Sequence, residues 1–386
     1  VTRALELHNS DILYAHMLLA CQLYETFDPL NKAIPSFTRE SGGVNIPPMI
    51  VVDLDDRYDL ISHLNPAFAM YGHRRPDGTE MEPGDKITVD TFDKGEMVLW
   101  EDGKTFEGET SPRGRVFSAA ENRERMGVMA THLNNASLVV CSTKRLMDGL
   151  GEDWIKRKHD IVVYPNSIRE MDFPMVDLAP HKEVRILWQG GQSHHEDLFE
   201  IAESLGRMAR KYPNTKWIFF GAQFSWVQRA IPEEQLEYIP WVPYEEHRAR
   251  MAIIAHDIAL APLRRTEFNA AKSAIKFYES SMRLRPAATL GANWGPYGDE
   301  MIDGKTGLTY DNIEEFEAKL ELLINNEELR LKLGHAAKDW VLENREAGTT
   351  TPKLYEALVE RLARHKVERR SWIPRTVEKC DKIFER

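Results

Sequence analysis

Short apolar runs alternate with helical patterns along most of the chain. In the first half, near-continuous apolar runs that end in polar residues lie at 11–16, 47–56, 136–143 and 159–166. Runs of this kind are typical of parallel sheets that are covered on both faces. The pattern therefore predicts a parallel sheet in the first half, with a helix that begins at Lys144 after the third run.

A second series of strands and helices follows a linker at 169–183, which contains two prolines and shows no periodicity. Its apolar runs predict strands at 184–191, 215–222, 236–243, 256–263, 285–292 and 306–311. Strands that alternate with helices predict a doubly wound α/β sheet. Two such series in one chain predict two Rossmann-like domains that face a cleft.

The predicted domain boundaries follow these two series. We expect a first domain at 1–175, a second domain at 176–345, and a helical tail at 346–386 that packs back on the first domain. The segment at about 72–115 interrupts the first series and is rich in glycine and charged residues. Two apolar stretches within it predict a β-hairpin, which we interpret as an insertion in the first domain.

The stretch NAAKSAIKFYESS, at 269–281, predicts a helix with an unusual face. Lys272, Lys276 and Glu279 lie at i, i+4 and i+7 and so form one narrow stripe, while the other sides of the helix are apolar. A helix that is apolar on most sides is normally buried. The stripe is therefore either a solvated face with a Lys276–Glu279 surface pair, or a set of charges that faces a ligand.

The place of this helix in the series favours a ligand. The helix follows the strand at 256–263, and doubly wound sheets bind ligands at the carboxyl ends of their strands. The amino end of a helix attracts an anion, and Lys272, Lys276 and the Ser273 hydroxyl add to that attraction. Glu279 lies one turn deeper, where a carboxylate can accept hydrogen bonds from a diol such as a ribose. The stretch predicts one half of a site for a nucleotide diphosphate sugar.

Composition narrows the range of partners. The 386-residue chain carries a formal net charge of -11, which argues against a global electrostatic grip on nucleic acid or anionic lipid but leaves a local basic patch open. The three widely spaced cysteines form neither a disulfide framework nor a metal-ligand pattern. We therefore expect a reducing, cytoplasmic location. No apolar run reaches the roughly 18 residues that a membrane span needs.

An acidic cluster ends the strand at 47–56. Its members are Asp53, Asp55 and Asp56. One interpretation is a metal-binding motif. We favour contact with donor or acceptor hydroxyls, and we expect neither a metal nor a cofactor. His16, at the end of the run at 11–16, is either a site residue or a buried core histidine.

Several stretches, in their order and spacing, resemble the GT-B glycosyltransferases of the large retaining, group 1 type. One stretch resembles their donor-binding half: DIALAPLRRTEFNAAKSAIKFYESSMRLRPAATLGANWGPYGDEMIDGKTGLTYDN. Between about 136 and 343, the resemblance also includes ASLVVCSTKRLMDGL, IVVYPNSI, RILWQGGQSHHEDL and YIPWVPYEEH. It implies a two-domain GT-B fold, a nucleotide-sugar donor, transfer with retention of configuration, and no metal requirement.

The resemblance also implies roles for residues near the phosphates. Gly190 and Gly191 form the turn that lets backbone amides approach the donor phosphates. Ser193, His194 and His195 follow this turn near the donor, although a loop-surface role is an equal alternative for the two histidines.

Further roles follow from the same resemblance. Val242 belongs to a segment that brackets the nucleobase, and Glu279 matches the second acid of the family's pair of glutamates, which holds the ribose. The first acid of that pair falls at Ala271, so Asn269 or Lys272 takes part of its work. His16 resembles a strand-end histidine of the family. The family's first domain usually opens with further units, so here they are either missing or the domain is reduced.

We therefore predict a glycosyltransferase that moves a sugar from a UDP- or GDP-sugar to a saccharide or another hydroxyl acceptor. The predicted catalytic residues are Lys272, Lys276, Asp53, Asp55, Asp56 and His16. A phage-type transferase acting on modified DNA bases is one alternative, because arginines flank the predicted hairpin. A GT-B-like sugar-nucleotide epimerase and a degenerate sugar-nucleotide-binding protein are the others.

Overall fold

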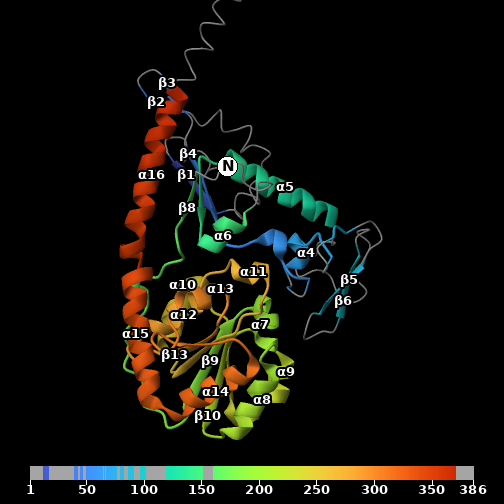
Figure 1. Ribbon diagram of the computed structural model, residues 1–386, viewed down its shortest axis with the longest axis vertical. Coiled ribbons are helices and arrows are strands. Elements are labelled where there is room, and N and C mark those ends of the chain that lie inside the picture. Colours follow the sequence, from blue (N-terminus) through green and yellow to red (C-terminus); the bar gives the residue numbers. More distant parts are fainter. Residues whose placement is uncertain are drawn as a thin grey trace, which may run out of the picture. The chain divides into compact units, whose positions relative to one another are not determined.

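The protein divides into two compact units, each built from separate parts of the chain. The computed structural model describes residues 12–16, 39–41, 44–46, 49–63, 65, 67–75, 79–81, 86–90, 96–100, 119–150 and 160–370. Unit 1 comprises Val1–Asp55, Arg125–Tyr164 and Thr351–Arg386, and unit 2 comprises Asp56–Glu124 and Pro165–Thr350. Figure 1 shows the elements of both units in colours that follow the sequence.

Unit 1 is built on a four-stranded parallel sheet with the order β1-β4-β7-β8. Its strands are β1 Ile12–His16, β4 Met49–Leu54, β7 Leu138–Cys141 and β8 Ile161–Val163. The predicted parallel sheet of the first half is therefore confirmed. β7 is buried along its whole length, which explains its unbroken apolar sequence. A short antiparallel pair, β2 Arg39–Ser41 and β3 Val44–Ile46, lies outside this sheet.

Among the described residues, three helices accompany the sheet of unit 1. They are α5 Ala119–Asn135, α6 Lys144–Gly149 and α16 Ala347–Arg370, and the division between the units falls within α5 and α16. The helix predicted at Lys144 is confirmed, and its amino end is fixed by the Thr143 hydroxyl, which accepts a hydrogen bond from the Leu146 amide over 3.0 Å. Leu354, Leu358 and Leu362 lie four residues apart on α16 and pack against buried residues of β4 and β7.

Unit 2 is built on a six-stranded parallel sheet with the order β11-β10-β9-β12-β13-β14. Its strands are β9 Val184–Gly190, β10 Thr215–Gly221, β11 Leu236–Ile239, β12 Ile258–Ala261, β13 Ala288–Ala292 and β14 Leu308–Tyr310. Numbered by their place in the series, the strands follow the order 3-2-1-4-5-6, which is that of the dinucleotide-binding fold. The second predicted series is therefore confirmed as a doubly wound sheet.

Helices cover both faces of this sheet, as Figure 1 shows. On one side α8 contacts α9 and α14, and on the other α12 contacts α10 and α15. The helices of unit 2 are α7 His195–Phe199, α8 Ala202–Lys211, α9 Ser225–Ala230, α10 Tyr244–Ile253, α11 Glu267–Ala270, α12 Ile275–Ser281, α13 Gly295–Glu300, α14 Ile313–Asn325 and α15 Glu327–Arg345. In the part of the chain that the structure describes, no helix is long and apolar enough to cross a membrane.

The segment after Asp56 groups with unit 2, and the predicted domain boundaries at residues 175 and 345 stay predictions. It contains η3 Tyr58–Leu60, α4 Phe68–Tyr71 and two antiparallel strands, β5 Lys86–Asp90 and β6 Glu96–Trp100. The reason is apolar packing: Ile61 and Phe68 share a buried cluster with Phe268 of α11. These strands lie within the segment predicted as a hairpin, and most of the rest of 72–115 lies outside the described residues, so the insertion stays a prediction.

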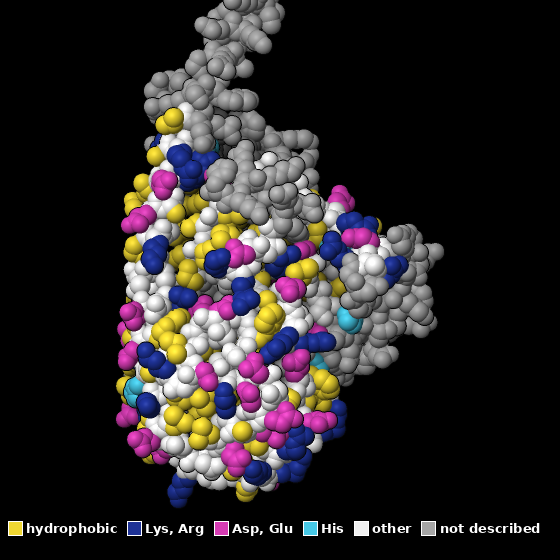
Figure 2. Space-filling view, in the orientation of Figure 1, with side chains coloured by type: hydrophobic (Ala, Val, Ile, Leu, Met, Phe, Trp, Pro, Cys, Tyr) yellow, Lys and Arg dark blue, Asp and Glu magenta, His cyan; other side chains and the backbone are white. Residues whose placement is uncertain are grey.

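Charged side chains of both signs are interspersed over the face of unit 2 that Figure 2 displays. Exposed ion pairs also link elements of unit 2, such as Lys211 with Glu321 and Arg265 with Asp311. Isolated exposed pairs of this kind add little stability, because water and salt screen them.

A buried ion pair fixes α16 on unit 1 and gives a stability prediction. The Arg361 guanidinium is buried, donates to the Ser137 carbonyl over 2.7 Å and lies 3.4 Å from the Asp160 carboxylate. Removing one partner of a buried pair strands the other charge. We expect Arg361→Met to lower the free energy of unfolding, measured by urea denaturation, by about 3 kcal/mol or more.

The matched control is Arg364→Met, about one turn further along α16. Arg364 is exposed and its partner Glu360 lies 3.8 Å away in solvent. Its loss should cost less than about 1 kcal/mol. Equal effects of the two substitutions would show that the Arg361 pair does not hold α16 in place.

Candidate functional site

The candidate site lies at the carboxyl edge of the unit 2 sheet, where the strand order reverses. β9 and β12 are neighbours at this point, and the chain leaves them in opposite directions towards β10 and β13. Doubly wound sheets bind ligands in the crevice that this reversal opens. The predicted residues after β9 and after β12 are therefore brought together by the topology of unit 2.

The glycine turn after β9 makes a close backbone approach to β10. The Ala222 amide donates to the Gly190 carbonyl over 2.8 Å, and Gly221 has a φ of 115°. A Cβ atom on Gly221 would lie 2.5 Å from the Gly190 oxygen, so no other residue fits there without a shift of the backbone. Gly191 packs more loosely, with the Trp241 ring 3.4 Å from the place of its missing Cβ. Rings of Trp188 and Trp241 pack against the two glycines, so the turn is tight and closely surrounded.

Asp197 joins the two halves of this edge. Its buried carboxylate accepts hydrogen bonds from the Asn269 side-chain amide over 2.7 Å and from the Arg264 backbone amide over 3.0 Å, both after β12. His194 Nδ1 lies 2.8 Å from the other carboxylate oxygen. Neighbouring Glu196 pairs with the Arg264 guanidinium. Sequence reasoning missed Asp197, although its i+3 spacing from His194 on a short helix was a usable signal.

His194 and His195 have different environments. The His194 ring donates from Nδ1 to Asp197, which leaves Nε2 as an acceptor, and burial together with Lys276 and Lys272 holds the pKa of His194 well below its ordinary value. His195 is buried among aromatic rings instead, and its Nε2 accepts a hydrogen bond from the Trp226 indole over 2.8 Å. These contacts favour a packing role for His195. Ser193, between the turn and the histidines, is exposed.

The predicted helix at 269–281 is wrong in one respect, because it is broken. α11 ends at Ala270 and α12 begins at Ile275, so Lys272 and Ser273 lie in the connection and not on a stripe with Lys276. Asn269, next to the end of α11, turns its side chain to Asp197 and to the Arg264 carbonyl. An anion site at the start of one long helix is therefore not present.

Lys276 and Glu279 are nevertheless buried, with 6% and 8% of their surface exposed. The alternative of a solvated surface pair is therefore wrong. Burial lowers the pKa of Lys276 to about 8 and raises the pKa of Glu279 to about 7. Gln189 donates to Glu279 over 3.1 Å, and the Lys276 ammonium lies 6.0 Å from the Trp188 ring. Perturbed groups of both signs in one buried place are typical of functional sites.

A group of rings lies beside Glu279. His247 Nδ1 is 3.6 Å from the Glu279 carboxylate, and the His247 ring stacks on Phe220 with their centroids 5.1 Å apart. Trp241 is 6.0 Å from His247 and 55% exposed, and Val242 follows it half-buried. Sequence reasoning missed His247, because nothing in the local pattern of α10 separates it from surface residues.

The predicted acidic cluster divides between the two units. Asp53 and Asp55 belong to unit 1, whereas Asp56 begins unit 2. In unit 1 the parallel register places His16 opposite Asp53 at the carboxyl ends of β1 and β4. The charge of Asp53 adds to the effect of burial in raising the pKa of Cys141 to about 12. The roles of these residues in catalysis stay predictions.

Known proteins resemble this chain in fold but not in sequence. No protein-family model and no curated protein matches the sequence. Among solved structures, HepE of Anabaena in complex with UDP is 11% identical over 93% of this chain and 81% of its own, with a TM-score of 0.57. A sucrose-phosphate synthase of Thermosynechococcus elongatus is 10% identical over 91% of this chain and 74% of its own, with a TM-score of 0.52.

A third structure is that of TarM from S. aureus with fondaparinux, α-GlcNAc-glycerol and UDP. It is 10% identical over 82% of this chain, with a TM-score of 0.50, and this chain covers 51% of its length. The fold is that of the GT-B glycosyltransferases. The predicted GT-B fold class is thereby confirmed. This chain spans about half the length of TarM. Sequence identities of about 10% show a shared fold and no more.

Lys276 gives a prediction for the candidate site. Its pKa near 8 means that the ammonium loses its proton just above neutrality. We expect the affinity for UDP-glucose to fall as pH rises through about 8, because the neutral amine no longer attracts the diphosphate. Lys276→Met should weaken binding about tenfold to a hundredfold at neutral pH and abolish this alkaline limb. Calorimetric titration across pH measures both, with exposed Lys332→Met on α15 as the control.

Glu279 gives a prediction for the acid limb of the pH dependence of UDP-glucose affinity. Its pKa near 7 means that the carboxylate gains a proton as pH falls through neutrality. Affinity for UDP-glucose should therefore fall below about pH 7, and Glu279→Gln should weaken binding above that pH while removing the acid limb. The diphosphate of UDP-glucose does not itself titrate near neutrality, so the limb belongs to the protein. An unchanged acid limb in Glu279→Gln would exclude Glu279 as its source.

Proposed function

We propose that the protein is a glycosyltransferase that takes a sugar from a UDP-sugar and transfers it to a saccharide hydroxyl. The observation that carries this proposal is the pair of oppositely charged, buried groups, Lys276 and Glu279, at the switch point of the unit 2 sheet. A nucleotide sugar needs cationic groups at its diphosphate and an acceptor at its ribose diol. HepE, in structures with UDP and with UDP-glucose, and TarM, with UDP and a saccharide, support the donor and acceptor classes.

Each group at this edge has a part in donor binding under the proposal. Lys276 and Lys272 attract the diphosphate, and the bare backbone of Gly190 and Gly191 lets amides approach it. Glu279 accepts from the ribose hydroxyls, and Gln189 holds its carboxylate in place. Trp241 offers an exposed ring on which the base can stack.

The reaction under the proposal is a displacement at the anomeric carbon. The bond between that carbon and the diphosphate oxygen breaks, a bond to the acceptor oxygen forms, and the acceptor proton passes to the departing phosphate. Negative charge grows on the diphosphate as the bond breaks, so preorganised ammonium groups stabilise the transition state more than the ground state. The configuration is retained because the acceptor attacks from the face that the diphosphate leaves.

The deciding experiment is incubation of the protein with a panel of UDP-, GDP- and other nucleotide sugars without acceptor. We expect slow release of free UDP from one UDP-sugar, at a rate that Lys276→Met reduces at least about tenfold and Lys332→Met leaves unchanged. Conversion of the donor into its epimer would contradict the proposal, as would tight binding of UDP-sugars without release of UDP under any condition. Saccharide acceptors are then added to the active donor to measure transfer.

A further inference from the structure

A cavity of about 410 Å³ lies beside the candidate site, between the segment after Asp56 and the loop after β12. Both parts belong to unit 2. Arg264 connects the cavity to the candidate site, because it lines the cavity while its backbone amide donates to Asp197 over 3.0 Å. The volume is within the range of about 300 to 1,000 Å³ that is usual for small-molecule pockets. A ligand in this cavity would therefore lie next to the proposed donor.

One part of the lining is apolar and closely packed. Leu60, Ile61 and Phe68 belong to it, and Ile61 and Phe68 are 8% and 2% exposed. A Cβ atom on Gly72 would lie 2.2 Å from the Phe68 ring, so a glycine is needed for the chain to pass this ring so closely. The carbon atoms of a sugar ring can pack on such a surface.

The other part of the lining carries more cationic than anionic side chains. Among the described residues, three arginines line the cavity, namely Arg74, Arg75 and Arg264, and one carboxylate does, that of Asp59. Asp59 is bound through both oxygens by Arg57, over 2.8 and 2.7 Å. Because Arg57 compensates this carboxylate from outside the lining, the lining itself keeps an excess of guanidinium groups.

Two of these arginines keep N–H donors for a ligand. A guanidinium has five N–H groups. In the described contacts Arg74 uses only Nε, towards Glu80 over 3.2 Å, and 46% of its side chain is exposed. Arg264 is 40% exposed and uses Nη1 for Glu196, with its Nε 3.7 Å from Glu200. Both arginines can therefore bind an oxyanion without releasing these carboxylates.

The acid at Arg74 is shared with a second arginine. Glu80 accepts from Arg74 through one oxygen and from Arg123 of α5, over 2.9 Å, through the other. One negative charge thus faces two positive charges at this side of the cavity. An anionic ligand supplies a further negative charge there, and a neutral sugar does not.

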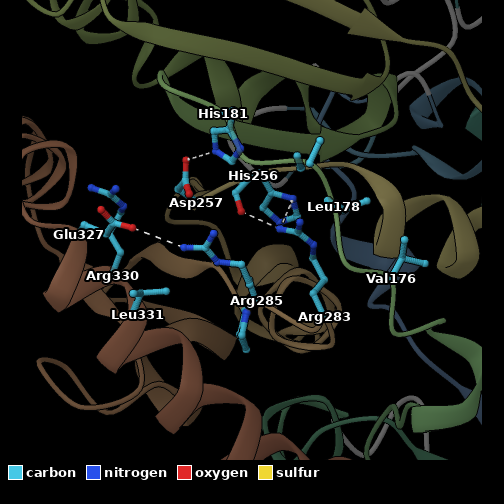
Figure 3. Close-up of a pocket in the computed structure, with 13 residues that line it drawn as sticks. Val176, Leu178, His181, His256, Asp257, Arg283, Arg285, Glu327, Arg330 and Leu331 are labelled. Atoms are coloured by element: carbon cyan, nitrogen blue, oxygen red, sulfur yellow. Dashed lines mark hydrogen bonds and ion pairs between the residues drawn. The ribbon is translucent and has the colours of Figure 1, made fainter.

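A cavity at the amino edge of the same sheet lacks these properties. Figure 3 shows it, with Arg285 joined to Glu327 and His181 joined to Asp257. Its volume is about 30 Å³, which leaves room for little more than water. The arginines beside the candidate site, in contrast, line a space that admits a sugar.

We propose that the cavity beside Arg264 holds the acceptor, and that this acceptor is a saccharide with a negatively charged group, namely a carboxylate, a phosphate or a sulfate. The inference rests on the proposed glycosyltransferase function and narrows its acceptor class. The sugar packs on the apolar part of the lining, and the charged group binds the exposed guanidinium groups, that of Arg74 among them. Arginine suits this task because its planar fork binds two oxygens of one anion. The net charge of -11 disfavours nucleic acid as the occupant.

The test is a binding titration of the whole chain with four sugars that differ only at C6: glucose, glucuronate, glucose 6-phosphate and glucose 6-sulfate. Saturating UDP is present throughout, so that the lysines of the proposed donor site are occupied. Saturation-transfer NMR gives the dissociation constants. We expect at least one charged sugar to bind about tenfold or more tightly than glucose, because its oxygens accept charge-assisted hydrogen bonds. The charged sugar that binds most tightly then identifies the anionic group.

Arg74→Gln and Arg123→Gln form a matched pair of variants. Both arginines bind Glu80 and each has 46% of its side chain exposed, but of the two only Arg74 lines the cavity. Arg74→Gln should weaken binding of the preferred charged sugar about tenfold and leave glucose unchanged. Arg123→Gln removes the same charge from outside the cavity and should change both affinities by less than about twofold. Thermal unfolding checks that both variants are folded.

Three outcomes would overturn the anionic acceptor. The first is equal affinity for glucose and all three charged sugars, and the second is an equal effect of the two substitutions. The third is displacement of the charged sugar by a duplex oligonucleotide at lower concentration and with a steep dependence on salt, which would assign the cavity to nucleic acid.

Donor hydrolysis separates this inference from the proposed function. Without acceptor, Arg74→Gln should release UDP from the active UDP-sugar at the parent rate, and with a charged acceptor it should show a raised acceptor KM. Absence of any donor hydrolysis by the parent would contradict the proposed function, whatever sugars the cavity binds. Donor hydrolysis together with equal binding of charged and neutral sugars would leave the proposed function intact and refute the acceptor class alone.

Discussion

The geometry of the proposed donor site depends on the buried carboxylate of Asp197. Burial alone works to raise the pKa of this group, but the hydrogen bond from His194 and the charges of Lys272 and Lys276 lower it overall, so the carboxylate is ionised. An ionised group inside a protein is tolerated only when its oxygens are bonded. Here they bind the loop after β9 to the loop after β12, and Asn269 and His194 are held in consequence.

The ionised Asp197 also makes the buried ammonium of Lys276 tolerable, yet only in part. In the folded state the pKa of Lys276 is near 8, below the ordinary lysine value of 10.5. Between pH 8 and 10.5 unfolding therefore takes up a proton, and the free energy of unfolding rises with pH. For Glu279 the folded pKa near 7 exceeds 4.5, so unfolding releases a proton and stability falls with pH between 4.5 and 7. Between about pH 7 and 8 both groups are charged, so the folded state bears the full free-energy cost of burying each charge. A donor that contacts both charges relieves both costs, which is how a site can hold strain that its ligand removes.

The sequence was sufficient for what depends on neighbouring residues and insufficient for what depends on distant ones. The apolar runs of β9 and β12 and the apolar flanks of Lys276 are local, and they predicted the sheet and the burial of the stripe. The contact of Asn269 with Asp197, beside the break between α11 and α12, joins residues that are 72 positions apart. The grouping of the segment after Asp56 with unit 2 depends in the same way on Phe268, and neither contact leaves a periodic trace.

The resemblance to group 1 enzymes predicts that Asn269 or Lys272 takes part of the work of an acid that would fall at Ala271, and the contacts of the two residues differ. Ala271 itself is buried. Asn269 has both hydrogens of its side-chain amide engaged, one by Asp197 and one by the Arg264 carbonyl, and it cannot donate to a donor sugar without releasing Asp197. Lys272 is only half-buried, in the connection between α11 and α12, with its ammonium 4.7 Å from the Phe268 ring. Of these residues, Lys272 is therefore the one whose charged group stays free of a buried hydrogen bond in the described contacts, and its role in catalysis stays a prediction.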